Sequence, residues 1–283
     1  MSKGTLYLVA TPIGNLGDFS PRAREVLSTV DFVAAEDTRV THKLFTALGL
    51  PPKPMVSYYE HNRRQRGEEV LSRLLAGEDC ALVTDAGMPA VSDPGEDLVA
   101  LAAAHGIEVL PVPGCCAAVC ALAVSGLPTG RWCFEGFLSV NKKARREHLE
   151  ALKGEKRTMI FYEAPHKLRN TLEDLRAVFG EGRRISLSRE MTKLHEETLR
   201  MTLGEAAAYF AENAPRGEFV LILEGAPETA EDGGGRMEAA VEAVRQRTEA
   251  GESVKDAVKM VSSSMGVKKN ALYQRVIDTE STQ

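Results

Sequence analysis

The sequence predicts an α/β protein of two lobes followed by a small helical domain. Short apolar segments alternate with amphipathic ones in the first part of the chain, which is typical of βα units and of a mainly parallel sheet with helices on both faces. After Pro113-Gly114 several strands are joined by short connections, which predicts a mixed sheet. From Arg236 onward the pattern is helical throughout. We therefore expect domains at residues 1–118, 119–226 and 227–283.

The first lobe is expected to begin with a buried strand and to alternate strands with helices. The predicted strands are Thr5–Ala10, Phe32–Ala35, Cys80–Thr84 and Ile107–Val112. Ser20 is the expected N-cap of a first helix with Pro21 at its first position, and Gly49 is expected to end a helix over Val40–Leu48. Another helix is expected over Glu68–Leu75. Asp93-Pro94-Gly95-Glu96 has the spacing of a capping box, so a further helix is expected to begin there, with Asp93 as its cap.

The second lobe and the tail follow from the same kind of pattern. An almost wholly apolar helix is predicted over Cys116–Val124, and further helices near Leu149, Leu172 and Ala207. The predicted strands are Trp132–Leu138, Thr158–Glu163, Ile185–Arg189, Thr198–Thr202 and Glu218–Leu223. Ala226–Gly235 is acidic and glycine-rich, which predicts a linker. Gly266 separates two helical segments in the manner of a helix-turn-helix, a pattern that also occurs in hairpins that bind nothing.

Composition limits the classes of function. The chain has 283 residues, 43% of them hydrophobic, and a net charge of −5, which excludes a globally basic nucleic-acid binder but leaves room for local basic clusters. No segment approaches the roughly 20 apolar residues that a membrane span needs, and no secretory signal pattern opens the chain, so a cytoplasmic protein is expected. The cysteines lack CxxC spacing, and no metal site is predicted.

Two loops have a composition that a simple connector does not need. Thr11–Asp18 follows the first strand and contains two glycines, and Thr84–Gly95 combines glycines, prolines, aspartates and hydroxyls. In an open parallel sheet, ligands bind at the carboxyl ends of the strands, where both loops lie. Val112–Ala118 adds small residues at a third strand-to-helix turn. The first loop is not GxGxxG, so an NAD-dependent oxidoreductase is disfavoured.

These loops, as TPIGNLGD, TDAGMPAVSDPG and PVPGCCAA in this order, resemble the tetrapyrrole methylase superfamily, the class III methyltransferases. Within it, AEDTR (Ala35–Arg39), FYEAPHKL (Phe161–Leu168) and SREMTKLHEE (Ser188–Glu197) resemble one branch, which methylates the 2′-hydroxyl of a cytidine ribose in the decoding centre of 16S ribosomal RNA. The resemblance covers nearly the whole chain. It departs from the usual pattern at Cys115-Cys116 and at Met191, both of which we interpret as packing changes.

The resemblance implies a bilobal tetrapyrrole methylase-like fold, a homodimer, and S-adenosylmethionine in the cleft between the lobes. The substrate that it implies is 16S rRNA or the small ribosomal subunit. The residues that it assigns to the cofactor are Pro12, Gly14, Asn15, Asp85, Ala86, Gly87, Ser92, Asp93, Ala117, Ala164 and Pro165.

The reaction needs alignment and, because a ribose hydroxyl is a weak nucleophile, benefits from a base. Asp37 and Glu163 are the preferred candidates, although Asp37 has the alternative of capping a helix; further candidates are Glu36, His61, His166 and Glu190. Basic residues are read as phosphate contacts. They are Arg39, Arg63, Arg64, Lys142, Lys143, Arg189, Lys193, Lys268 and Lys269. Tyr58-Tyr59 could stack a base or pack inward.

Three alternatives stay open at this point. One is a methyltransferase of the same superfamily that acts on a corrin-type small molecule or on a protein. A second is a non-catalytic regulator that senses S-adenosylmethionine and grips DNA through the tail. The third is the NAD-dependent oxidoreductase already disfavoured.

Overall fold

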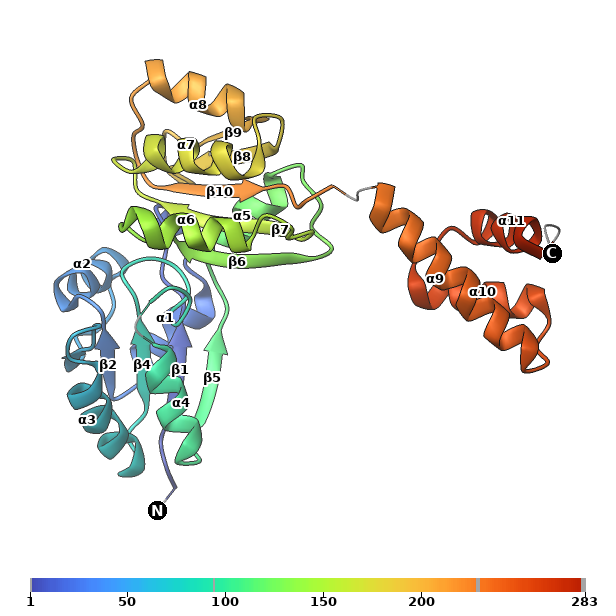
Figure 1. Ribbon diagram of the computed structural model, residues 1–283. Helices are drawn as coiled ribbons and strands as arrows, with labels where there is room; N and C mark the ends of the chain where they lie inside the picture. The colour runs from blue at the N-terminus through green and yellow to red at the C-terminus, as the bar shows by residue number, and fades with distance from the viewer. Residues whose placement is uncertain (1, 94, 228–229, 281–283) are drawn as a thin grey trace. The chain divides into compact units, whose positions relative to one another are not determined.

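The computed structural model describes residues 2–93, 95–227 and 230–280, and the chain divides into two compact units, Met1–Gly225 and Ala226–Gln283 (Figure 1). The first unit holds both predicted lobes. Within the described ranges, no helix is both long and apolar enough to span a membrane.

The N-terminal lobe is built on a parallel sheet, as the alternation of strands and helices predicts. Its strands are β1 (Thr5–Val9), β2 (Phe32–Ala35), β3 (Met55–Ser57), β4 (Cys80–Val83) and β5 (Glu108–Val112). They lie in the order β3-β2-β4-β1-β5, and every pairing is parallel. The sequence reading missed β3, because three residues are too short to show a periodicity. The order places β1 in the interior of the sheet, next to β4 and β5.

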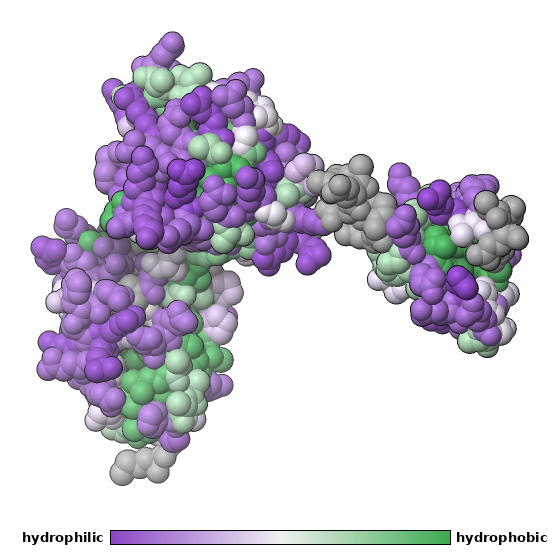
Figure 2. All heavy atoms as spheres, in the orientation of Figure 1, coloured by the Kyte–Doolittle hydropathy of each residue, from purple (hydrophilic) through white to green (hydrophobic). Residues whose placement is uncertain are grey.

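Helices cover both faces of this sheet. They are α1 (Pro21–Thr29), α2 (Thr38–Leu48), α3 (Arg63–Leu75) and α4 (Glu96–Ala104). Alternate strand residues face opposite sides, so Leu6 and Leu82 pack with α3 and α4, whereas Val9 and Val83 pack with α1 and α2. Figure 2 shows apolar residues gathered over α4, whose sequence EDLVALAAA is largely apolar.

Two helix ends match the prediction and one does not. Ser20 Oγ accepts from Ala23 N at 3.0 Å, and Gly49 ends α2 with φ of +63°. The predicted cap at Asp93 is wrong: Gly95 is the N-cap of α4 and makes no side-chain hydrogen bond, while Pro94 lies outside the described residues. The Asp93 side chain lines a cavity, which is why it is not available to cap the helix.

The second lobe contains the predicted mixed sheet. Its strands are β6 (Trp132–Phe137), β7 (Thr158–Glu163), β8 (Arg184–Arg189), β9 (Glu197–Thr202) and β10 (Phe219–Leu223). In the order β6-β7-β10-β8-β9, only the β6–β7 pairing is parallel. Its helices are α5 (Ala117–Val124), α6 (Lys142–Ala151), α7 (Leu168–Phe179) and α8 (Leu203–Glu212). Helices α6, α7 and α8 cover one face, and α5 packs on the other against Ile160 and Ile222.

The second unit is a helical bundle with a core of its own. Helices α9 (Ala230–Glu249), α10 (Val254–Met265) and α11 (Lys269–Glu280) bury Val244, Val258 and Leu272 against one another. Gly266 ends α10 with φ of +65°, as expected at the turn. The linker predicted over Ala226–Gly235 is wrong from residue 230, where α9 begins; residues 228–229 lie outside the described part. Glycine disfavours a helix by only about 1 kcal/mol per residue, which a long helix packed on its neighbours offsets.

Candidate active site in the cleft between the lobes

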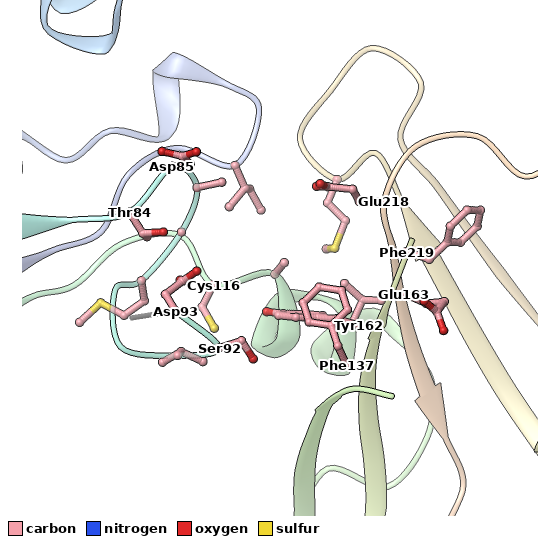
Figure 3. A pocket seen from close by; sticks show the side chains of 18 of the residues that line it. Thr84, Asp85, Ser92, Asp93, Cys116, Phe137, Tyr162, Glu163, Glu218 and Phe219 are labelled. Atoms are coloured by element: carbon pink, nitrogen blue, oxygen red, sulfur yellow. The ribbon is translucent and has the colours of Figure 1, made fainter. Parts of the chain in front are cut away.

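A cavity of about 310 Å³ lies between the two lobes of the first unit (Figure 3). One wall comes from the N-terminal lobe and consists mainly of the loop after β4. The opposite wall comes from β6, β7, β10 and the segment after β8. The volume lies at the lower end of the range of small-molecule sites in proteins.

The two loops singled out by composition are joined directly. Thr11 N donates to Gly87 O at 2.9 Å, and Gly87 N donates to Thr11 O at 3.1 Å, so the two residues form an isolated antiparallel bridge. Thr11 Oγ1 also donates to Thr84 O at 3.0 Å. The loops after β1 and β4 therefore form one framework at the carboxyl edge of the sheet, where ligands of such sheets bind.

The loop after β4 is held in unusual backbone conformations. Gly87 has φ of +90°, and the non-glycine residues Ala90 and Ser92 have φ of +65° and +63°. Conformations of this kind cost of order 1–3 kcal/mol each and concentrate at functional sites. A Cβ at Gly95 would lie 3.0 Å from Ala90 N, so the loop also folds tightly back on itself.

Three carboxylates lie together on the N-terminal wall. Thr84 Oγ1 donates to Glu36 at 2.7 Å, and Asp37 N donates to Asp85 at 3.3 Å. Burial, followed by the nearby negative charge of Glu36, raises the pKa of Asp93 to about 6. Burial and Glu36 likewise raise the pKa of Asp85. A site of this charge favours a cationic ligand.

The opposite wall holds aromatic and apolar side chains beside the charged Glu190, Lys193 and Glu218. The Tyr162 hydroxyl accepts a hydrogen bond from Ala118 N, at the start of α5, over 3.2 Å. Its ring packs edge-on against Phe134, with 5.2 Å between ring centroids. Burial is the main cause that raises the pKa of Tyr162 to about 12. Phe137 and Met191 continue this wall. A flat, largely apolar ligand surface would fit here.

Glu163 lines the cavity at the end of β7, as expected, but its carboxylate is already held by neighbouring donors. In Figure 3 its side chain points away from Tyr162 and from the residues of the N-terminal wall. The side chain is buried, with 3% of the residue exposed, and its carboxylate accepts from Thr171 Oγ1 on α7 and from Ala164 N at 2.9 Å. These contacts make it a structural link between β7 and α7.

The segment after β8 packs against the first loop. Glu190 and Thr192 have φ of +50° and +65°, which is strained for residues with a Cβ. A Cβ at Gly14 would lie 2.5 Å from Lys193 Cγ and 3.0 Å from Thr192 Oγ1, so a larger residue there would displace the Lys193 side chain. Glu190 lines the cavity and accepts from Lys193 Nζ at 3.0 Å.

The structure brings together most, but not all, of the residues that the resemblance assigns to the cofactor. The cavity lining contains Asp85, Ala86, Gly87, Ser92, Asp93, Ala117 and Ala164. Pro12 and Gly14 instead line a neighbouring cavity of about 280 Å³ beside α2. Asn15 is exposed and caps the 3-10 helix η1 (Leu16–Asp18) by accepting from Gly17 N at 2.9 Å. Asn15 and Pro165 are not among the residues that line either cavity.

The candidate bases are dispersed. Glu36, Glu163 and Glu190 line the main cavity, whereas Asp37 caps α2 and lines a separate depression with Arg39. The Arg39 guanidinium, which donates to Asp37 at 2.6 Å, lowers the pKa of Asp37 to about 2. His61 lies near Tyr59, at 6.3 Å between ring centroids, and neither His61 nor His166 belongs to the described lining. An ionised Asp37 held by arginine is a weak base.

The sequence reading missed the C-terminal wall. Phe137, Tyr162, Met191 and Phe219 all line the cavity, yet each follows the apolar pattern of a strand or its end. The only feature of the sequence that could have indicated this wall was Tyr162, because a tyrosine hydroxyl needs a hydrogen-bond partner when it is buried in a strand. The Tyr58-Tyr59 pair divides: Tyr58 is buried in the core and Tyr59 is exposed.

Several predicted phosphate contacts are already paired with carboxylates. Arg63 pairs with Asp97 at 3.0 Å, and Arg189 donates to Glu197 at 2.7 Å. Arg39 and Lys193 have the partners given above. Lys143 lies 3.8 Å from Glu147 but is exposed, as are the other members of the set, Arg64, Lys142, Lys268 and Lys269.

Two lobes of this topology, joined around a cleft at the carboxyl edge of a parallel sheet, form the architecture of the tetrapyrrole (corrin/porphyrin) methylases, and the model of that family matches residues 5–207. The model of the RsmI C-terminal HTH domain matches residues 236–279. The chain belongs to the family of ribosomal RNA small subunit methyltransferase I.

Two relatives and one solved structure illustrate the match. The ribosomal RNA small subunit methyltransferase I of Synechocystis sp. is 53% identical, over 79% of this chain and 80% of the relative. That of Pseudomonas aeruginosa is 45% identical over 99% of both chains. The uroporphyrin-III C-methyltransferase from Thermus thermophilus complexed with S-adenosylhomocysteine has a TM-score of 0.54 at 20% identity, covering 78% of this chain and 97% of the other. At this identity the last comparison supports the fold alone.

Proposed function

We propose that this chain transfers a methyl group from S-adenosylmethionine to 16S ribosomal RNA, and that the acceptor is the 2′-hydroxyl of a cytidine ribose in the decoding centre. The observation that carries the proposal is the inter-lobe cavity, in a chain that matches relatives named for small-subunit rRNA methylation over nearly its whole length. An rRNA substrate places the reaction in the cytoplasm.

The chemistry of the cavity fits S-adenosylmethionine. The cofactor carries a sulfonium cation, which the carboxylates of Glu36, Asp85 and Asp93 attract. The positive-φ backbone at Gly87 and the small side chain of Ala117 allow close approach of a ligand to the main chain. We assign cofactor contacts to Asp85, Ala86, Gly87, Ser92, Ala117 and Ala164. When bound, the cofactor supplies an electrophilic methyl group.

The residues of the protein mainly position the reactants for methyl transfer. The strained loop after β4 and the aromatic wall around Tyr162 fix the orientation of whatever lies between them. The exposed basic residues Arg64, Lys142, Lys143, Lys268 and Lys269 are proposed to contact phosphates of the RNA. A single-stranded or splayed segment is the form of RNA that presents a ribose to such a cleft.

A second copy of the chain is part of the proposal. Helix α5 is apolar along its whole length, yet Val119 and Val124 are 48% and 44% exposed. An exposed apolar helix face marks an interaction surface. We therefore infer a homodimer in which the partner covers α5.

Mapping of ribose methylation tests the proposed function. Ribosomal RNA from a strain that lacks the gene is compared by mass spectrometry with RNA from strains complemented by wild type or by Gly87→Val. We expect one 2′-O-methylcytidine in 16S rRNA to disappear and to return only with wild type. Retention of every ribose methyl in the deletion strain would overturn the proposal.

A further inference from the structure

We propose that Asp93 is the general base of the reaction, an inference that rests on the proposed function. The Asp93 carboxylate and the Tyr162 hydroxyl line opposite walls of the inter-lobe cavity (Figure 3). A hydroxyl group bound between them would meet a hydrogen-bond acceptor on one side and a neutral phenol on the other. Asp93 is thus a catalytic residue rather than only a cofactor contact.

The other buried or half-buried carboxylates of the cavity already accept hydrogen bonds. Glu36 accepts from Thr84 Oγ1 at 2.7 Å, and Glu190 accepts from Lys193 Nζ at 3.0 Å. Glu163 is turned toward Thr171. The Thr84 hydroxyl donates to Glu36 and is also a hydrogen-bond partner that lowers the pKa of Asp93, but one donor occupies only part of the acceptor capacity of the Asp93 carboxylate. Asp93 therefore keeps acceptor capacity for a ligand.

The surroundings of Asp93 keep it basic enough to take a proton. Its neighbours on the N-terminal wall are the carboxylates of Glu36 and Asp85, and the Tyr162 phenol faces it from β7. Burial and the negative charge of Glu36 raise its pKa to about 6, close to the range in which a general base works best near neutral pH. Asp37, with its pKa near 2, is ionised but far less basic.

The proton balance of the step is simple. As the ribose oxygen forms its bond to the methyl carbon, the carbon–sulfur bond breaks and its electron pair stays on sulfur. The hydroxyl proton passes to the Asp93 carboxylate and from there to solvent after the products leave. No further reactant is needed.

The test compares full-length wild type, Asp93→Asn, Asp93→Glu and the control Glu96→Gln, an exposed residue on α4. Single-turnover methyl transfer from tritium-labelled S-adenosylmethionine to small subunits from the deletion strain is measured from pH 5 to 9. Calorimetry gives the affinity for S-adenosylhomocysteine, and thermal unfolding confirms that each variant is folded.

We expect Asp93→Asn to slow transfer about 100-fold or more, which is the usual contribution of a general base. The wild-type rate should rise with pH through about 6 as the carboxylate ionises, and this limb should be absent in Asp93→Asn. S-Adenosylhomocysteine affinity should stay within about threefold of wild type, Asp93→Glu should recover part of the rate, and Glu96→Gln should resemble wild type.

Two results would overturn the assignment. One is an Asp93→Asn rate within about fivefold of wild type, because a base contributes far more than that. The other is an equal loss of rate and of S-adenosylhomocysteine affinity, which would make Asp93 a cofactor contact. If the wild-type protein binds S-adenosylhomocysteine but methylates no RNA, the proposed function is overturned instead. This outcome is distinguishable because it is observed in the wild-type protein alone, without any variant.

Discussion

The Tyr162 hydroxyl accepts a hydrogen bond from Ala118 N over 3.2 Å and thereby ties β7 to the first turn of α5. The backbone N–H groups of a first helical turn have no partner within their own helix. The Tyr162 hydroxyl oxygen satisfies one of these N–H groups. The hydroxyl stays protonated near neutral pH, because its pKa is raised to about 12. The phenol can therefore donate a hydrogen bond into the cavity.

We expect Tyr162→Phe to lose both functions of the hydroxyl. Leaving Ala118 N without its partner should cost about 1 kcal/mol of the free energy of unfolding. Loss of a donor to the ligand should weaken S-adenosylhomocysteine binding roughly tenfold. Denaturant unfolding and calorimetry measure the two effects, with Tyr209→Phe, at an exposed residue of α8, as control. Unchanged affinity would mean that the phenol does not contact the cofactor.

Gly87 should not tolerate a side chain. Its φ of +90° is strained for any residue with a Cβ, so Gly87→Ala should destabilise the protein by about 1–3 kcal/mol. Because Gly87 pairs with Thr11, the strain should also disturb the cavity and weaken S-adenosylhomocysteine binding. Gly49→Ala is the matched control, since Gly49 also has positive φ but lies in open space at the end of α2. Equal loss of affinity in both variants would contradict the local role of Gly87.

Glu163 should prove structural. Thr171→Val would leave its buried carboxylate short of a donor, at a cost of about 1–3 kcal/mol in unfolding free energy. Glu163→Gln should lower the melting temperature yet keep the single-turnover rate within about threefold of wild type, because a residue outside the chemistry contributes little to the barrier. A 100-fold fall in rate in a folded Glu163→Gln protein would restore Glu163 as a candidate base.

Charge on the exposed face of α5 should separate the proposed dimer. Val119→Lys and Val124→Lys place a cation on a surface that we expect a second copy to bury. Sedimentation equilibrium should report dimers for wild type and monomers for these variants. Val140→Lys, at a residue 74% exposed between β6 and α6, is the control and should remain dimeric. Wild-type monomers, or dimers in all four proteins, would exclude α5 as the interface.

The tail should supply part of the electrostatic binding of RNA. Lys268 and Lys269 are exposed at the start of α11, and each phosphate contact contributes about one unit to the slope of log affinity against log salt. Lys268→Ala with Lys269→Ala should therefore reduce that slope by up to about two units while S-adenosylhomocysteine affinity is unchanged. Lys153→Ala, exposed after α6, serves as control. An unaltered slope would show that these lysines do not contact phosphates.

The features predicted correctly from the sequence are those that short local patterns determine. The parallel and mixed sheets were confirmed because strand spacing and turn residues signal them directly. Loop Thr84–Gly95 was recognised from composition, and it does form one wall of the cavity. Strand β3 and the start of α9 were mispredicted, because one is too short for a period and the other is helical despite its glycines.

The rest depended on contacts between distant parts of the chain. Asp93 has the spacing of a helix cap, and nothing local reveals that the cavity takes its side chain instead. Glu163 lies in a conspicuous motif, but its direction depends on Thr171 of the following helix. In the sequence, Tyr162 and Phe137 look like ordinary strand residues. Their place in the cavity depends on how the second lobe packs opposite the first. The domain boundary near residue 118 stays a prediction.

The position of β1 affects how the protein is made. Of the strands in its sheet, β1 is the first to leave the ribosome, yet it pairs with β4 and β5, which follow α1, β2, α2, β3 and α3 along the chain. Until β4 emerges, the apolar residues of β1 have no sheet to join, and the bridge between Thr11 and Gly87 cannot form. A nascent chain is therefore unable to build this cavity before its first lobe is complete, and in the meantime β1 is a segment that chaperones would recognise.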